Sequence, residues 1–277
     1  MSIIKNEFML CFPNAKINLG LNIINKRPDG YHNIETIFYP IPVVDALEIT
    51  HAETLSFSQT GIKIDTLIEK NLVVKALNLL KKQYKIPDVE IHLLKAIPFG
   101  AGLGGGSADA AFMLKLLNDY FNLHISIEIL EELASEIGAD CPFFIRNKPV
   151  FASGIGNIFE PINLSLKGYY LCLIKPEIMV PTPEAYSKVI PKVPVISLKE
   201  IIQRPISEWK QWMVNDFESS VFSKHPEIES IKNFLYRKGA IYAAMSGSGS
   251  SVFGLFEEAT HLKSLFNGCF VWEGPLT

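Results

Sequence analysis

The chain has few cysteines, and they lie far apart. Its 277 residues include four, Cys11, Cys141, Cys172 and Cys269. No two of them have the Cys-x-x-Cys spacing that zinc and redox sites use, and no Cys/His cluster resembles a metal site. We therefore expect them to be small buried side chains in a reducing compartment.

The sequence also lacks an excess of charge of one sign and a long apolar run. Lys+Arg number 26 against 29 Asp+Glu, a net charge of -3, with no basic stripe for nucleic acid. No apolar stretch approaches the ~20 residues that span a bilayer, and the N-terminus does not resemble a signal peptide. We expect a cytoplasmic protein that binds neither nucleic acid nor membrane.

Hydrophobic residues are plentiful, at 48% of the chain. A chain of this size and composition can build a large core and is near the length at which one core becomes two. Glycines cluster near residue 155, which favours a boundary there. We expect an N-terminal domain over residues 1–158 and a C-terminal domain over residues 159–277.

The most informative segment is residues 98–111, PFGAGLGGGSADAA, with five glycines among the seven positions 100–106. Glycine permits tight turns and lets a ligand approach the backbone closely. An apolar run typical of a helix follows directly. The N-terminus of a helix presents unpaired N–H groups and the positive end of the helix dipole, so the pattern predicts a phosphate-binding loop.

Known phosphate loops differ from this one. The Walker pattern needs a lysine after its last glycine, but Gly106 is followed by Ser107. A dinucleotide G-x-G-x-x-G pattern begins at Gly100, yet its acidic partner Asp119 falls inside a helical segment instead of following a strand. No His-Arg-Asp or Asp-Phe-Gly triplet of protein kinases follows. A glycine turn that merely packs a helix on a sheet remains an alternative.

Periodicity of the apolar residues gives a coarse secondary structure. A half-buried strand is expected over residues 17–23, and the helix at 126–138 should have Ser126 as N-cap and Gly138 at C′. A proline-rich connection with extended backbone is expected over 176–194. The remaining expected elements are a helix over 71–84 and strands over 89–93, 169–174, 241–245 and 252–256.

Four further segments carry polar groups suited to a site. Lys16 and Asn18 are two residues apart on a strand and so share a face. Tyr31 and His32 follow a Pro-Asp-Gly turn and could line a pocket for a planar base. Asp140 lies between a helix end and an apolar segment, where it is either catalytic or a cap. A second loop, SGSGSS at 246–251, could approach a ligand or simply be a hairpin turn.

Together these segments resemble the GHMP kinases, which include galactokinase, homoserine kinase, mevalonate kinase and phosphomevalonate kinase. The resemblance is carried by residues 15–19, 27–32, 98–111, 138–144, 175–176, 215–218 and 246–251, with Thr182 and Tyr186. It implies an α+β, two-domain GHMP kinase fold, with an N-terminal domain like ribosomal protein S5 domain 2 and a ferredoxin-like C-terminal domain. It further implies ATP-dependent phosphorylation of a small alcohol with Mg²⁺, by a monomer or weak homodimer. The segment at 29–32 is typical of members with a cytidine diphosphate substrate.

The resemblance also implies roles for single residues. Lys16 and Asp140 would be the catalytic pair. The residues expected to bind ATP are Asn71, Lys95, Pro98, Gly100, Gly102, Leu103, Gly104, Gly105, Gly106 and Ser107. Those expected to bind the substrate are Asn18, Tyr31, His32, Asp140, Thr182, Tyr186, Gly247 and Gly249.

One departure leaves the metal ligands open. Ala108 stands where many members of the family have serine, so a hydroxyl near the phosphates is missing. Ser107 or Asp109 is then a candidate neighbour of Mg²⁺. Two alternatives also stay open: another small-alcohol kinase of the same family, and a nucleotide-binding relative without catalysis.

Overall fold

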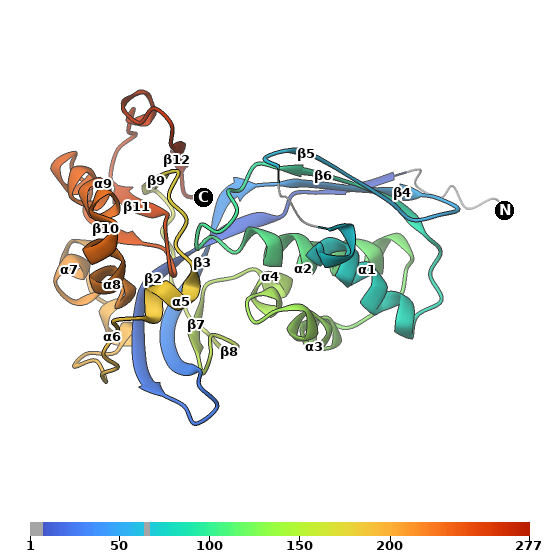
Figure 1. The fold of residues 1–277 in the computed structure, drawn as a ribbon, viewed down its shortest axis with the longest axis horizontal. Coiled ribbons are helices and arrows are strands. Elements are labelled where there is room, and N and C mark those ends of the chain that lie inside the picture. The colour runs from blue at the N-terminus through green and yellow to red at the C-terminus, as the bar shows by residue number, and fades with distance from the viewer. Residues whose placement is uncertain (1–7, 64–66) are drawn as a thin grey trace. The chain divides into compact units, whose positions relative to one another are not determined.

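The chain forms mixed helices and sheets, as the computed structural model describes for residues 8–63 and 67–277 (Figure 1). The expected α+β class is confirmed. The chain divides into two compact units, the first from residues 8–15, 42–63, 67–99 and 104–147. The second takes Lys16–Ile41, Gly100–Leu103 and Lys148–Thr277. Both units are discontinuous in sequence, and the single boundary at 158/159 stays a prediction.

The first unit holds a four-stranded sheet in the order β1–β4–β6–β5. Its strands are β1 (Phe8–Cys11), β4 (Ala46–His51), β5 (Ser56–Gly61) and β6 (Val89–Lys95). β5 and β6 pair in parallel, whereas β4 pairs antiparallel with both β1 and β6. The connection from β5 to β6 contains the 3₁₀ turn η1 (Ile68–Lys70) and helix α1 (Leu72–Gln83). The strand predicted over 89–93 is confirmed.

Two helices of this unit begin at side-chain caps, of which Ser126 was predicted. The Asn71 side chain caps α1 by accepting the Val73 N–H at 2.9 Å. Ser126 caps α3 (Ile127–Ile137) by accepting the Ile129 N–H. Helices α2 (Gly105–Tyr120) and α4 (Cys141–Arg146) complete the set, with α2 packed against α1, α3 and α4.

The role predicted for Gly138 is wrong. The residue has φ -179°, an extended conformation that any residue adopts, and it is the C-cap of α3 instead of a left-handed C′ residue. The chain turns at once into α4, with the Cys141 N–H bonded to the Gly138 carbonyl at 3.1 Å. A Cβ at Gly138 would lie 3.3 Å from the Cys141 Sγ, so the sharp turn leaves little room for a side chain.

A second sheet has the order β2–β3–β7–β8. Its strands are β2 (Asn14–Lys26), β3 (His32–Val44), β7 (Val150–Ser153) and β8 (Ile158–Pro161). The prediction of a half-buried strand at 17–23 is wrong, because β2 is buried on both faces over residues 15–23. Residues 214–216 cover the edge of β2, where the Leu21 N–H bonds to the Val214 carbonyl at 2.8 Å. The buried Lys16 and Asn18 side chains of β2 are hydrogen-bonded within the protein, as buried polar groups usually are.

The third sheet has the order β10–β11–β9–β12, with every neighbouring pair antiparallel. Its strands are β9 (Tyr170–Lys175), β10 (Tyr242–Met245), β11 (Val252–Phe256) and β12 (Phe270–Pro275). A β10–β11 hairpin beside β9, with β12 on the other side, is the strand order of ferredoxin-like domains. The short turn η2 (Lys263–Leu265) stands where such a domain has its second helix.

Five helices belong to this part of the chain. They are α5 (Thr182–Tyr186), α6 (Leu198–Ile201), α7 (Ile206–Trp212), α8 (Phe217–Lys224) and α9 (Pro226–Arg237). Helix α5 interrupts the proline-rich segment that we expected to be extended throughout. Proline stands in its first turn, where a missing N–H costs nothing.

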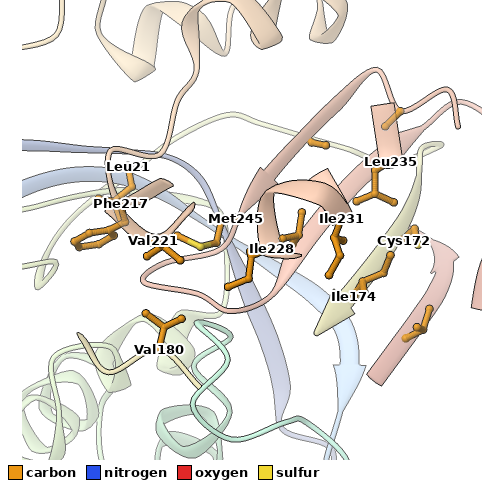
Figure 2. Packing of buried hydrophobic residues seen from close by; sticks show 14 of the residues in the cluster. Leu21, Cys172, Ile174, Val180, Phe217, Val221, Ile228, Ile231, Leu235 and Met245 are labelled. Carbon is orange, nitrogen blue, oxygen red and sulfur yellow. The ribbon is translucent and has the colours of Figure 1, made fainter. Parts of the chain in front are cut away.

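The core of the second unit lies between α8, α9 and the third sheet. Ile228, Ile231 and Leu235 project from one face of α9 toward Cys172 and Ile174 of β9 (Figure 2). All four cysteines are free; Cys141 and Cys172 are buried, whereas Cys11 and Cys269 are only half-buried. No helix in the described part of the chain combines the length and apolar character that crossing a membrane requires.

Leu235→Ala should destabilise the protein, because Leu235 is fully buried in this core. Truncating a buried leucine to alanine costs about 2–5 kcal/mol. Val195→Ala is the control, since Val195 is 96% exposed. Urea unfolding would measure both, and an equal midpoint for the two variants would contradict the packing described.

Candidate active site

The glycine loop joins β6 to α2 and has an alternating backbone. Gly100, Gly102 and Gly104 have φ of +62°, +72° and +71°. Left-handed residues at alternate positions turn successive N–H groups toward one concave side, a geometry that binds anions. Gly104 is the N-cap of α2, and no side chain among the described residues caps that helix. The N–H groups of its first turn are therefore available to an anion.

A second loop, residues 246–251, packs directly on the first. A Cβ on Gly102 would lie 2.0 Å from the Ser246 carbonyl oxygen, so only glycine allows this approach. Gly247 and Gly249 have φ of +55° and +91°. The Asn215 Nδ2 donates to the carbonyls of Met245 at 2.7 Å and Gly247 at 2.8 Å, which fixes the start of the second loop.

Lys16 and Ser246 both bond to the Gly102 carbonyl, and Ser246 thereby joins the two loops. The Lys16 Nζ donates to the Asn18 Oδ1 at 2.6 Å and to the Gly102 carbonyl at 3.3 Å. The Ser246 hydroxyl donates to the same carbonyl at 2.9 Å and accepts the Asn18 N–H at 3.2 Å. Lys16 also lies 4.6 Å over the Phe38 ring. The prediction that Lys16 and Asn18 share a face is confirmed, and their surroundings are buried instead of solvated.

Three polar residues of this network had no role assigned from the sequence. Thr36 accepts the Asn18 Nδ2 at 2.9 Å and donates to the Gly20 carbonyl. Ser246 and Asn215 lie in segments that carry the family resemblance, and that resemblance could have indicated a role for both residues. Thr36 follows polar residues in the first half of β3, and no pattern in the sequence distinguishes it.

His32 and Tyr186, 154 positions apart in the chain, are brought together. Their rings stack with centroids 4.7 Å apart and an interplanar angle of 20°. Burial, and secondly the charge of Lys26, lowers the pKa of His32, which favours the neutral imidazole. The Phe217 ring supports Tyr186 edge-on at 4.7 Å.

The other expected substrate residues nearby are more exposed. Tyr31 is 63% exposed and lies on the turn before β3. The Thr182 hydroxyl lies 3.5 Å from that of Ser248 in the second loop. The described contacts therefore join Thr182 to the second loop and leave Tyr31 on the surface.

Lys95 lies in a buried ionic cluster. Its Nζ bonds to the Asp45 Oδ2 at 2.5 Å and to the Asp109 Oδ2 at 2.7 Å. The three side chains are only 1–3% exposed. Burial alone would lower the pKa of Lys95, but the two carboxylates outweigh it and raise that pKa. Lys95 therefore stays charged.

Asp109 titrates near neutral pH within this cluster. Burial raises its pKa to about 8, with Asp45 adding to the shift and Lys95 opposing it. Cys11 of β1 and Lys115 of α2 are the next titratable groups. The expectation that Asp109 lies beside Mg²⁺ is wrong, because its carboxylate is buried against the Lys95 ammonium.

Asp140 is half-buried between α3 and α4 and makes no capping hydrogen bond to α4. The Asp140 side chain therefore does not cap α4, and its catalytic role stays a prediction. The neighbouring Cys141 thiol is bonded to the Ser107 hydroxyl of α2, and burial raises its pKa to about 11. The contact between Cys141 and Ser107 thus joins α4 to α2, one residue after Asp140.

Hydroxyl and carboxylate oxygens, such as those of Ser107 and Asp140, are of the donor type that Mg²⁺ prefers. Mg²⁺ keeps several waters and binds one or two protein carboxylates together with substrate phosphates. Residues 8–63 and 67–277 contain no group of three or more His, Cys, Asp and Glu side chains suited to a metal. Such an ion would be held mainly by the phosphates, and its protein donors stay a prediction.

Comparison with known proteins agrees with this geometry. The family description "GHMP kinases N terminal domain" matches residues 71–148, and "GHMP kinases C terminal" matches residues 197–268. A protein of Parabacteroides distasonis named 4-diphosphocytidyl-2-C-methyl-D-erythritol kinase is 70% identical over 97% of this chain and 100% of its own length. One of the same name from Bacteroides fragilis is 60% identical, also over 97% and 100%.

A solved structure of a protein named for the same activity has a similar fold. The crystal structure of a 4-(cytidine 5'-diphospho)-2C-methyl-D-erythritol kinase superposes with a TM-score of 0.83 at 31% identity. The match covers 97% of this chain and 99% of that one.

Gly102→Ala should disrupt the site because the new Cβ would meet the second loop. Gly268→Ala is the matched control, with φ of +77° and nothing within 4 Å of its Cβ. The control carries only the left-handed strain of about 1–2 kcal/mol, whereas Gly102→Ala adds displacement of both loops. Thermal unfolding and ATP affinity by calorimetry would compare them. Equal losses in both variants would contradict the loop contact.

Asp109→Asn should remove a pH dependence of stability. The unfolded carboxyl ionises near pH 3.8, whereas folded Asp109 keeps its proton to about pH 8. The folded state therefore binds more protons between these values, and its stability falls as pH rises. The wild type should lose stability relative to the variant across this range, by at most about 1.4 kcal/mol per pH unit. Parallel urea-midpoint curves would contradict the assignment.

Proposed function

The chain belongs to the GHMP kinase family, and we propose that it transfers the γ-phosphoryl group of ATP to the 2-hydroxyl of 4-diphosphocytidyl-2-C-methyl-D-erythritol. The family consists of ATP-dependent small-molecule kinases, so the chain is an enzyme of this class. The expected two-domain GHMP kinase fold is confirmed. The substrate is supported by the names of relatives that match the chain along nearly its whole length.

One observation carries the proposal: the ammonium group of Lys16 is bonded to the Gly102 carbonyl of the glycine loop. In phosphoryl transfer the protein mainly positions the groups and offsets charge. Fixed N–H donors and a fixed cation do so without reorganising during the reaction. Here the lysine comes from β2, instead of the end of the loop where a Walker lysine stands. We therefore assign Lys16 to the oxygens of the reacting groups.

Asp140 is the residue we assign to the alcohol. A carboxylate within hydrogen-bond reach can accept the hydroxyl proton as the new P–O bond forms. Since the transition state of phosphoryl transfer is loose in most descriptions, orienting the hydroxyl is the larger part of that role. Mg²⁺, held by ATP phosphates with Ser107 or Asp140 as protein donors, would neutralise charge on the phosphate oxygens.

The binding residues follow the same assignment. Asn71 and Lys95 would lie near the adenine, Lys95 through its backbone because its ammonium is held by two carboxylates. The phosphates would meet Pro98, Gly100, Gly102, Leu103, Gly104, Gly105, Gly106 and Ser107. The substrate would meet Asn18, Tyr31, His32, Thr182, Tyr186, Gly247 and Gly249.

The His32–Tyr186 stack suits the cytosine ring in particular. A planar base gains from a rigid aromatic platform, because ring faces pack at little entropic cost. A monomer or weak homodimer and a cytoplasmic location complete the proposal.

An ADP-release assay tests the substrate. The purified protein is given ATP–Mg²⁺ with 4-diphosphocytidyl-2-C-methyl-D-erythritol, mevalonate, homoserine or galactose in separate reactions. Turnover of the first alone is the expected result. Turnover of another alcohol would instead establish a different small-alcohol kinase of the same family.

Asp140→Asn should lower kcat by about 10²–10⁴-fold, with a much smaller change in the KM for ATP. The amide keeps the size of the side chain but cannot accept the hydroxyl proton as a carboxylate does. Asp119→Asn, the same change on an exposed position of α2, should keep wild-type kinetics. Steady-state kinetics with both substrates would decide, and wild-type turnover in Asp140→Asn would remove this residue from the chemistry.

A further inference from the structure

The Lys95 cluster, formed by Asp45, Lys95 and Asp109, has no part in the chemistry described above. Asp45 fills the single position between β3 and β4. Its Oδ1 accepts the N–H groups of Ala96 at 2.6 Å and Ile97 at 2.8 Å. These two amides belong to the segment that enters the glycine loop. Asp45 therefore holds the loop at its beginning.

Asp109 holds the same loop at its end. It lies in the second turn of α2, just after the loop has become helix. Its Oδ2 is bonded to the Lys95 ammonium, and its Oδ1 is buried with no hydrogen-bond partner among the described residues. In the described structure, the hydrogen bond from Lys95 is thus what connects the Asp109 carboxyl group to the rest of the unit.

The start of α2 packs tightly on the entry segment. A Cβ on Gly105 would lie 2.8 Å from the Ile97 Cγ2 and 3.4 Å from the Lys95 Nζ. Gly105 has no left-handed backbone, so this close approach explains the glycine there. One ammonium group therefore lies between the two ends of the loop and is bonded to a carboxyl oxygen from each side.

We propose that Lys95 is a positioning residue for phosphoryl transfer, whose ammonium ties the entry of the glycine loop to the first turns of α2. The inference rests on the proposed function, since it assumes that this loop receives the ATP phosphates. A buried ion pair contributes little net stability compared with apolar side chains of the same size. Its value here is geometric, because it fixes where the N–H groups of the loop lie.

Lys95→Met and Asp109→Asn test the tie. Lys95→Met removes the ammonium, while Asp109→Asn keeps an acceptor for it and should retain more activity. The double variant Lys95→Met/Asp109→Asn leaves no ionisable side chain at either position and serves if the single Lys95 variant does not fold. Lys81→Met is the matched control, because it breaks the Lys81–Asp88 pair in the same unit, away from the loop.

Hydrogen exchange measures the order of the loop backbone, and kinetics measure the effect of each variant on catalysis. Amides in residues 99–107 should exchange faster in Lys95→Met and the double variant, and kcat/KM for ATP should fall about 10²-fold, as small misplacements of reacting groups do. The KM for the alcohol should not change. A cluster that is only structural would lower the unfolding temperature while the loop amides and the ATP kinetics of the folded variant stay as in the wild type, and that result would overturn the proposal.

Failure of the proposed function gives a different pattern. If the wild type phosphorylates no alcohol of the panel, the kinase assignment fails. Faster exchange at 99–107 in Lys95→Met, with none in Lys81→Met, would then still support the tie. Unchanged exchange at 99–107 in a working kinase would refute the tie alone.

Discussion

Two stretches of backbone meet at Gly102, and the polar groups of the second unit are arranged around that contact. The Gly102 carbonyl accepts hydrogen bonds from both Lys16 and Ser246. A side chain at this position would separate the loops and leave a buried lysine without one of its acceptors, which is costly inside a protein. The site therefore depends on the absence of one carbon atom at residue 102 as much as on any charged group.

The two glycine loops are held at their beginnings by the same kind of interaction. Each begins where a buried carboxylate accepts backbone N–H groups and pairs with a lysine. Asp45 does this for the first loop, with Lys95. Glu218 does it for the second, accepting the Met245 N–H at 2.8 Å and pairing with Lys232 at 2.6 Å. Glycine-rich segments lose much conformational entropy on ordering, and fixing their first residues from the core limits the conformations left to the rest.

Local patterns in the sequence predicted most of the fold. The helix after residue 71, the Ser126 cap and the strands around the second loop depend on neighbours within a few residues, and the structure has them as expected. Gly138 and residues 17–23 were misjudged for different reasons: Gly138 leads at once into a second helix, whereas the cover of residues 17–23 comes from a distant segment. The Cys141 sulfur crowds Gly138, and residues 214–216 cover a strand that by alternation alone would face water.

The candidate site divides in the same way. The spacing of Lys16 and Asn18 on a strand was sufficient to place them on one face. Asp109 was misassigned because nothing near it in the sequence announces that Lys95 and Asp45 will surround it. Thr36 was missed because a single threonine in a strand of mixed polarity looks like any other β-branched residue. Pairings across the fold, between residues tens of positions apart, are what a single sequence does not reveal.

The covering of β2 by residues 214–216 has a consequence for the behaviour of the protein in a crowded solution. Thirteen residues of strand rich in isoleucine and leucine would otherwise offer a row of amides to another chain. Both backbone groups of Leu21 are bonded within the chain, the Ile23 N–H is taken by the Asp216 carboxylate, and the Ile23 carbonyl by the Lys192 N–H. The segment that completes the sheet thus also protects it from strand addition and aggregation.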